Sequence, residues 1–305
     1  MKVALCFIIS YDHILNKEEI WRKWIGPNKD IINVYFYYKD LKKIKSQWIL
    51  EHIIPEKYIF KTSYYHVIPA YISSMNYAFT HDSQNKWFCM LSESCCPIIT
   101  PKMFRYLFFE NYNNSIMSWR KAWWNIQFHK RANLAKFPKE LHLANDPWFV
   151  LKRENVEHCI NFIKVSPKLT NTICDGGLAN ESLFAIILYM CEQLNTNNII
   201  SSVTHITDWS RMESPTSPHL FKYGDEIDIK FIDSSLETNK YAMFIRKISP
   251  EFPDDIIVEY VFNKDDTDLV IKEPWIVIYN KHKKMIFYFI LPVIVMVLIF
   301  NIYFF

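Results

Sequence analysis

The stretch Trp87–Thr100 reads WFCMLSESCCPIIT, and it decides the fold class of this chain. Its first part belongs to the run Lys86–Leu91. Apolar and polar residues do not alternate in this run, which therefore predicts a strand buried on both faces of a sheet. Ser92-Glu93-Ser94 ends this run, and a loop and a helix are expected over Pro97–Phe109. Ligands of open α/β sheets bind beyond the carboxyl ends of the strands, so the Ser-Glu-Ser segment is a candidate ligand contact.

Other strand-like runs alternate with amphipathic stretches. Val3–Ser10 and Ile31–Tyr38 are apolar or aromatic, and an amphipathic stretch with Trp21 and Trp24 separates them. This β-α-β order predicts an α/β fold, with a Rossmann-like, mostly parallel sheet flanked by helices. Further expected elements are a short helix at Lys42–His52, a short strand at Tyr58–Thr62, a helix at Pro69–Phe79, a turn at Asn145–Pro147 that leads into a strand ending at Leu151, an apolar helix capped by Asn180 that ends near Cys191, and a hairpin within Ile256–Ile278.

Composition excludes several classes of function. The net charge is only +3 and the lysines are scattered among acidic residues, so the chain lacks the one-sided basic face of a nucleic-acid-binding protein. The seven cysteines are odd in number and form no C-x-x-C pair, which argues against a zinc site and against a disulfide framework. They are expected to be small buried side chains in a reducing compartment.

The last 21 residues, Met285–Phe305, read MIFYFILPVIVMVLIFNIYFF and carry no charge. As a helix this segment would be about 31 Å long, enough to span a bilayer. We therefore expect a single C-terminal transmembrane anchor after a globular domain of residues 1–280. The basic group Lys281–Lys284 precedes the anchor and nothing charged follows it, so the positive-inside rule places residues 1–284 in the cytosol.

Five stretches share the order of motifs in a known family. FCMLSESCCPI (Phe88–Ile98) resembles the LSESC-x-P segment of the core-2/I-branching N-acetylglucosaminyltransferases. The other four, each similar to a later motif of that family, are LANDPWFVLKRE (Leu143–Glu154), GLANESLFAIIL (Gly177–Leu188), THITDWSR (Thr204–Arg211) and MFIRKI (Met243–Ile248). One departure stands out, because Asn145-Asp146-Pro147 occupies the place of the family's Gly-Ser-Gln.

The resemblance implies a GT-A fold that moves a sugar, N-acetylglucosamine or similar, from a UDP-sugar to a glycan or protein hydroxyl with inversion. Residues 1–110 would bind the nucleotide sugar, and residues 111–280 would supply acceptor and catalytic groups. It implies no metal and no other cofactor, since Ser92-Glu93-Ser94 stands where metal-dependent relatives have Asp-x-Asp and offers one carboxylate only. An alternative is an inactive member that binds glycans or nucleotides, which the Asn145-Asp146-Pro147 departure favours and the retained Glu181 and Lys247 oppose.

Family position also suggests roles for individual residues. Glu181 matches the general base, although a glutamate in the first turn of a helix is also favoured by the helix dipole. Lys247, with Arg246 beside it, would neutralise the donor diphosphate, and the second cation is either Lys222 or Lys230. Further candidate contacts to donor or acceptor are Ser10, Tyr11, Ser92, Glu93, Ser94, Asp146, Trp148, Trp209 and Arg211. For Trp148, stacking on a sugar and burial in the core remain alternatives.

Overall fold

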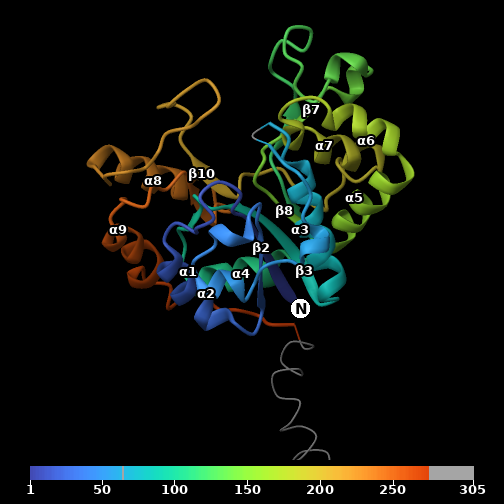
Figure 1. Ribbon diagram of the computed structural model, residues 1–305. Coiled ribbons are helices and arrows are strands. Elements are labelled where there is room, and N and C mark those ends of the chain that lie inside the picture. Colours follow the sequence, from blue (N-terminus) through green and yellow to red (C-terminus); the bar gives the residue numbers. More distant parts are fainter. Residues whose placement is uncertain (64, 275–305) are drawn as a thin grey trace, which may run out of the picture.

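The computed structural model describes residues 1–63 and 65–274 (Figure 1). Its centre is a six-stranded sheet in the order β2-β1-β3-β8-β5-β9. The strands are β1 (Lys2–Ile8), β2 (Ile32–Tyr37), β3 (Asn85–Ser92), β5 (Ser115–Ile116), β8 (Val150–Lys152) and β9 (Ile199–Ile200). The pairs β2-β1, β1-β3 and β5-β9 are parallel, whereas β8 runs antiparallel to β3 and β5. The prediction of an α/β fold with a mostly parallel central sheet is confirmed.

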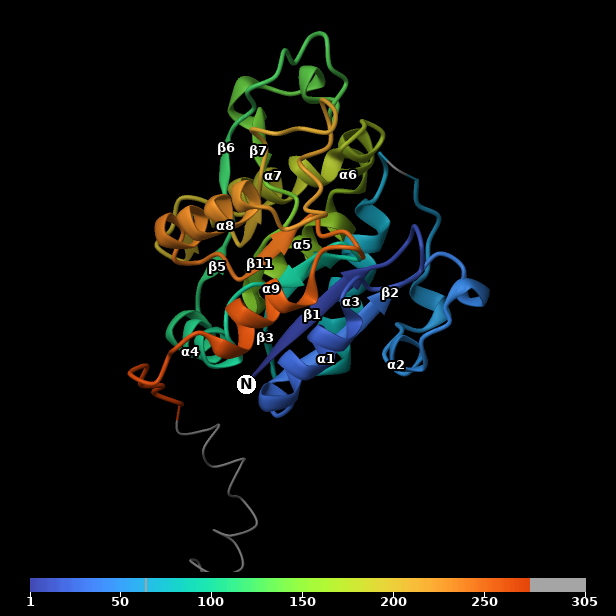
Figure 2. The same ribbon diagram turned by 90° about the vertical axis from the view of Figure 1, so that its left-hand side faces the viewer.

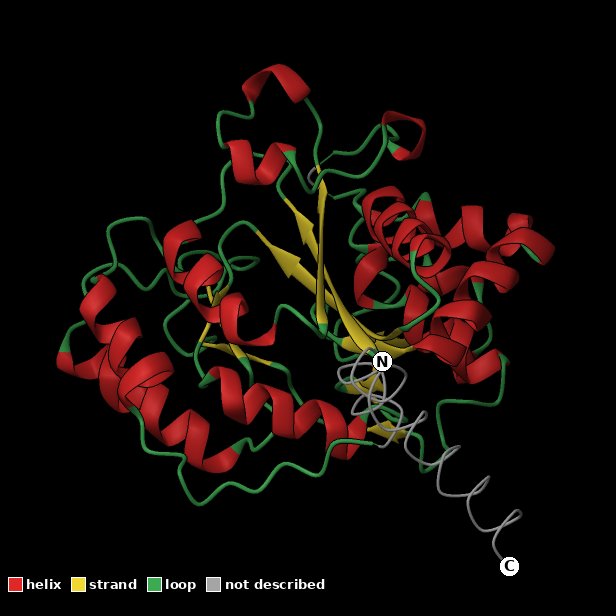
Figure 3. Ribbon diagram, turned by 90° about the horizontal axis from the view of Figure 1, so that it is seen from below, coloured by secondary structure: helices red, strands yellow, loops and turns green. Residues whose placement is uncertain are grey.

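Helices cover both faces of the sheet (Figures 1 and 3). One layer holds α3 (Ile68–His81), α5 (Arg153–Val165), α6 (Pro167–Cys174) and α7 (Leu183–Met190), and the other holds α1 (Glu18–Ile25) and α4 (Pro101–Asn111). Alternate residues of β1 enter the two cores: Leu5 packs with the α1 and α4 side, and Cys6 packs with the α3 and α7 side. Burial on both faces is the reason why β1 and β3 read as continuous apolar runs.

Two smaller sheets stand beside the central one and position the candidate site (Figure 2). In the first, β11 (Phe244–Arg246) pairs in parallel with β10 (His205–Thr207) and antiparallel with β4 (Cys96–Pro97). The second consists of β6 (Trp119–Lys121) and β7 (Leu143–Asn145). Segments more than 100 residues apart in the sequence are therefore brought to one edge of the molecule.

Two predicted strand regions are wrong. Tyr58–Thr62 is not a strand: a 3-10 turn covers Glu56–Tyr58, and the free edge of β2 is instead bridged by Ile53. The predicted hairpin is absent from the described part of Ile256–Ile278, where α9 (Asp254–Val258) continues into a π-helix at Glu259–Asn263.

The hairpin prediction is wrong because the β-branched residues of this segment favoured strands, although the residues before them carry a helix signal. Pro253 precedes Asp254 and Asp255 in the first turn, where acidic residues are favoured by the helix dipole. Ile257 and Val261, four residues apart, are both fully buried, as expected for one face of a helix.

Other boundaries needed adjustment. The helix expected at Lys42–His52 is divided into a 3-10 turn at Leu41–Lys43 and the short α2 (Gln47–Leu50), which Ser46 caps through its hydroxyl. Asn180 does not cap the apolar helix, because it lies within a 3-10 turn, Ala179–Glu181, that precedes the start of α7 at Leu183.

Within residues 1–63 and 65–274, no helix has the length and apolar character needed to cross a membrane. The anchor predicted at Met285–Phe305 lies outside the described residues, so the anchor and the cytosolic placement of the domain stay predictions.

Candidate active site

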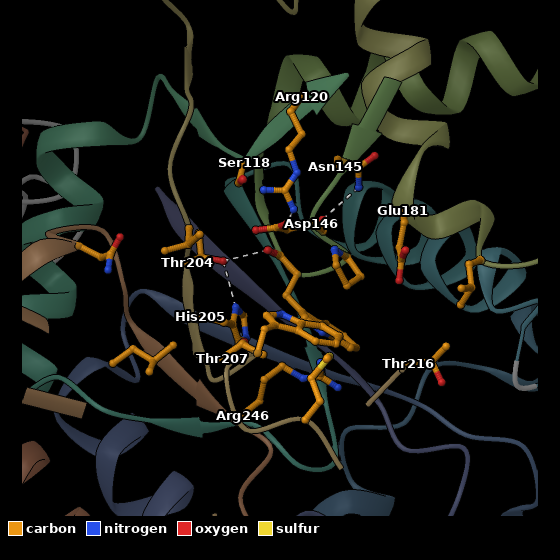
Figure 4. Close-up of a pocket in the computed structure, with 18 of the residues that line it drawn as sticks. Ser118, Arg120, Asn145, Asp146, Glu181, Thr204, His205, Thr207, Thr216 and Arg246 are labelled. Carbon is orange, nitrogen blue, oxygen red and sulfur yellow. Dashed lines mark hydrogen bonds and ion pairs between the residues drawn. The ribbon is translucent and has the colours of Figure 1, made fainter. Parts of the chain in front are cut away.

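A cavity of about 670 Å³ lies where β3 ends and β8 begins, bounded by the loop after β7, the turn before α7, and strands β10 and β11 (Figure 4). Five of the residues predicted from the sequence line it: Asp146, Trp148, Glu181, Trp209 and Arg246. Five further lining residues that sequence reasoning did not select are Ser118, Arg120, Arg131, Thr204 and His205. The cavity therefore combines three arginines with two carboxyl groups.

Glu181 is held in the cavity wall by a compact local structure. Asn145 donates a hydrogen bond from Nδ2 to the carbonyl of Asn180 (2.9 Å) and accepts one from the backbone N–H of Ala185 (3.2 Å). Its side chain thus ties β7 both to the turn and to α7. Gly176 permits the close approach of the loop before this turn, since a Cβ there would lie 2.3 Å from the backbone nitrogen of Asn133. The departure from the family pattern at Asn145 has a structural role.

The carboxyl group of Glu181 faces an arginine. Arg131 Nη1 lies 3.4 Å from Glu181 Oε2, and only 20% of the glutamate side chain is exposed. Burial raises the pKa of Glu181, and the positive charge of Arg131 opposes that rise. Asp146 adds a smaller upward influence on this pKa. The result is a carboxylate in a partly desolvated cavity whose charge is stabilised by one neighbouring cation.

Asp146 forms a second, looser pair on the same wall. Arg120 Nη2 lies 3.8 Å from Asp146 Oδ1, and the Arg120 guanidinium also stacks 4.1 Å from the centre of the Trp123 ring. Burial raises the pKa of Asp146, and Arg120 counteracts this. Sequence reasoning missed Arg120 and Arg131, although the mixture of basic and aromatic residues between Trp119 and Arg131 was a visible signal of ligand binding.

Arg246 forms the floor of the cavity together with Trp148. The side chain is only 9% exposed, and its guanidinium carbon lies 4.5 Å from the centre of the Trp148 ring. Burial lowers the pKa of Arg246, and within the described residues no carboxylate lies within ion-pair distance of it. Its Nε also lacks a hydrogen-bond partner there. A buried cation without a counter-charge is costly, so an anionic ligand would stabilise this site.

Glu93 and Lys247, both predicted to contact the donor, lie beside the cavity rather than in its lining. Glu93, directly after β3, accepts a hydrogen bond from the backbone of Tyr11, and Lys247 exerts a charge effect on it. Burial raises the pKa of Glu93 to about 7. Lys247 is half-buried and donates a hydrogen bond to Ser217 Oγ (2.8 Å); burial lowers its pKa, and Arg246 lowers it further.

The hydroxyls of Ser92 and Ser94 lie 3.2 Å apart, so the Ser-Glu-Ser segment forms a compact polar end to β3. Ser10 follows β1 at the same edge of the sheet. Within residues 1–63 and 65–274, no group of three or more His, Cys, Asp or Glu side chains is placed to hold a metal ion.

Three predicted residues are engaged elsewhere. Lys230 is exposed on α8 (Glu226–Thr238), where it pairs with Glu226 at 3.4 Å, and Lys222 lies over the ring of Tyr223. Arg211 pairs with Asp208 (2.6 Å) and with Asp228 on α8 (2.9 Å), both of which are buried. This arginine therefore fixes the loop after β10, which carries Trp209 at the rim of the cavity.

The fold and cavity describe an α/β protein with a polar, partly cationic ligand site at one edge of its central sheet. The core-2/I-branching enzyme family matches residues 33–234, well over half of the chain, and the chain belongs to this family of glycosyltransferases. The resemblance inferred from the five motifs is confirmed. No curated protein matches the sequence.

Among solved structures, one that is similar is the 4-diphosphocytidyl-2C-methyl-D-erythritol synthase of Anaerococcus prevotii. It shares 11% sequence identity with this chain, with a TM-score of 0.38, and the alignment covers 77% of this chain and 99% of that one. Because the likeness is this distant, it contributes nothing to the assignment of the site.

Proposed function

We propose that this protein is an inverting, metal-independent glycosyltransferase of GT-A type. It would transfer N-acetylglucosamine or a similar sugar from a UDP-sugar to a hydroxyl of a glycan or protein acceptor. The observation that carries the proposal is the presence in one cavity of a carboxylate, Glu181, and a buried cation without a counter-charge, Arg246. Inverting transfer needs these two groups, a base for the acceptor and a positive charge for the leaving diphosphate.

In the proposed reaction, Glu181 accepts the proton of the acceptor hydroxyl while the hydroxyl oxygen attacks the anomeric carbon of the donor sugar. The bond between that carbon and the diphosphate oxygen breaks, and its electron pair leaves with UDP. Arg131 favours the ionised form of Glu181 that this step requires. Arg246 and Lys247 stabilise the charge that develops on the diphosphate.

The nucleotide would bind at the carboxyl ends of β1 and β3, where Ser10, Tyr11 and the Ser92-Glu93-Ser94 segment lie. Lys247 Nζ uses one of its three protons on Ser217, so two remain for phosphate oxygens. The metal-free part of the proposal is supported by the single carboxylate of Ser-Glu-Ser and by the two adjacent cations, which can meet the phosphate charge directly.

The test uses the purified full-length chain and a panel of nucleotide sugars: UDP-N-acetylglucosamine, UDP-glucose, UDP-galactose and UDP-xylose. We expect at least one of them to raise the melting temperature and to be cleaved with release of UDP, and the cleavage to survive EDTA. Binding without cleavage of any donor would favour the inactive alternative. Activity that EDTA abolishes and Mn²⁺ restores would overturn the metal-free mechanism.

A further inference from the structure

His205 contributes a hydrogen-bonding atom to the cavity that none of the proposed roles uses. It begins β10, is only 6% exposed, and lines the cavity beside Thr204 (Figure 4). Thr204 Oγ1 donates a hydrogen bond to the carbonyl oxygen of Trp148 (3.1 Å) and lies 3.0 Å from His205 Nδ1. A threonine hydroxyl has one proton, and the carbonyl takes it, so in the contact with His205 the ring nitrogen must donate. This network places the imidazole proton on Nδ1.

His205 Nε2 is consequently an acceptor with a free lone pair. Among the described residues it has no hydrogen-bond partner. The ring packs against Phe244, with ring centres 5.1 Å apart, and lies 6.0 Å from the centre of the Trp148 ring. Burial, and then the charge of Arg246, lower the pKa of His205 well below its usual value. The ring therefore stays neutral at physiological pH, and a buried acceptor is left for a ligand to satisfy.

Two donors complete this polar floor. Trp148 Nε1 and Arg246 Nε are also buried, and within the described residues neither has a hydrogen-bond partner. An acceptor and two donors on residues that line one cavity match the hydroxyl groups of a sugar, each of which can donate one hydrogen bond and accept others. An apolar or deoxygenated group beside His205 would leave its Nε2 unsatisfied, and sites built in this way discriminate strongly against such analogues.

We infer that His205 Nε2 accepts a hydrogen bond from a hydroxyl group of the sugar bound in the cavity and thereby selects that sugar. The inference rests on the proposed function, because it deepens the description of the same site. Figure 4 shows His205 and Glu181 on opposite sides of the cavity, so His205 acts in recognition and takes no part in proton transfer. The hydroxyl can belong to the donor sugar or to the acceptor sugar, and the experiment has one arm for each.

Three variants isolate the Nε2 atom. His205→Asn keeps an N–H close to the position of Nδ1, so the bond to Thr204 is retained, and it removes only the acceptor. His205→Gln places an amide oxygen near the position of Nε2 and is the rescue variant. Thr204→Val keeps the shape of Thr204 but removes the oxygen that fixes the tautomer. Melting temperatures of all three identify any variant that fails to fold.

The donor arm measures hydrolysis of UDP-N-acetylglucosamine with water as the acceptor. The acceptor arm measures transfer from the same donor to methyl β-glycosides of galactose, glucose, N-acetylglucosamine and N-acetylgalactosamine. We expect His205→Asn to lower kcat/KM about tenfold in at least one arm, and His205→Gln to recover part of the loss. A loss in both arms assigns the hydroxyl to the donor sugar, and a loss in transfer alone assigns it to the acceptor. Unchanged kcat/KM in both arms overturns the inference.

A spectroscopic measurement separates this inference from the proposed function. In the ¹⁵N NMR spectrum of the imidazole, we expect a protonated Nδ1 and an unprotonated Nε2 that do not titrate between pH 5 and 8. Saturation with UDP-N-acetylglucosamine or with one of the four methyl glycosides should shift Nε2. If the wild type cleaves none of the four UDP-sugars of the panel, the proposed function fails while this readout still stands. A proton on Nε2, or an Nε2 signal that none of these five ligands moves, overturns the inference.

Discussion

Glu93 and Glu181 are both largely buried glutamates beside the same site, yet they differ in whether a cation lies at ion-pair distance. Glu181 has Arg131 at 3.4 Å, and this cation opposes the rise in pKa that burial causes. Glu93 has no cation within ion-pair distance among the described residues; its Oε2 is buried without a hydrogen-bond partner, and burial raises its pKa to about 7. Burial thus raises the pKa of both carboxyl groups, and an adjacent arginine opposes the rise at Glu181.

The difference shows how the fold assigns roles. A carboxylate whose ionised form is stabilised by a neighbouring cation can accept a proton, which suits Glu181 on the acceptor side of the cavity. A carboxyl group that is half-protonated near pH 7 can donate a hydrogen bond to a sugar or phosphate oxygen, which suits Glu93 at the end of β3. The distinction comes from one arginine, which lies 50 residues from Glu181 in the sequence.

The largest expected effect tests the role of the paired carboxylate. Glu181→Gln keeps the shape of the side chain but cannot accept a proton, so turnover should fall by roughly a hundredfold or more while donor binding is retained. Initial rates and calorimetric binding of UDP-N-acetylglucosamine measure the two quantities. Glu157→Gln, on the exposed face of α5, is the matched control and should leave both unchanged. A fully active Glu181→Gln variant would remove the proposed base.

The next effect concerns the cations near Glu93. Lys247→Ala should weaken binding of UDP about 10- to 100-fold and binding of uridine much less, because only UDP carries the phosphate charge that the lysine neutralises. Lys230→Ala is the control, since Lys230 is exposed on α8 and pairs with Glu226. Calorimetry with both ligands measures the losses. Equal losses for UDP and uridine would mark Lys247 as a structural residue.

Much of the fold was predictable because local patterns agreed with tertiary structure. The runs at β1, β2 and β3 are short, rich in β-branched and aromatic residues, and separated by an amphipathic helix and turns, which favours strands. The hairpin expected after Ile256 failed because β-branched residues there lie on a buried helix face. Pairing of β8 with β3 in the antiparallel direction also depends on long-range contacts that no local pattern reports.

The site was less predictable than the fold. Motif position selected Glu181 and Arg246, and both line the cavity. Arg131 and His205 were missed, because their importance depends on partners that only the folded chain supplies: Glu181 for the arginine, and the Thr204 hydroxyl for the histidine. Lys230 was selected by its distance along the sequence, but its helix directs it to a glutamate on the surface.

A charge change at Arg131 would make the two carboxyl groups more alike. Arg131→Gln removes the cation that lowers the pKa of Glu181, so the pKa should rise and the base should be protonated at a higher pH. Activity should therefore be lost earlier as the pH falls, about tenfold at pH 6 and less at pH 8. Arg131→Lys retains the charge and should keep the wild-type profile of kcat/KM against pH. Identical profiles for both variants would contradict the pairing.

The smallest effect tests the unpaired carboxyl group through stability. Burial raises the folded-state pKa of Glu93 from 4.5 to about 7, so between these values the unfolded chain releases a proton that the folded protein retains. Stability should therefore decline as the pH rises through this window, and no further decline is due to Glu93 once both states are ionised.

Glu93→Gln, which resembles the protonated form, should lack this decline. It should exceed the wild type by about 1 kcal/mol at pH 8, after allowance for residual solvent screening, and equal it at pH 4. Urea unfolding at both pH values measures the difference. A constant difference between variant and wild type would show that the pKa of Glu93 is the same in the folded and unfolded states, and the contrast with Glu181 would then disappear.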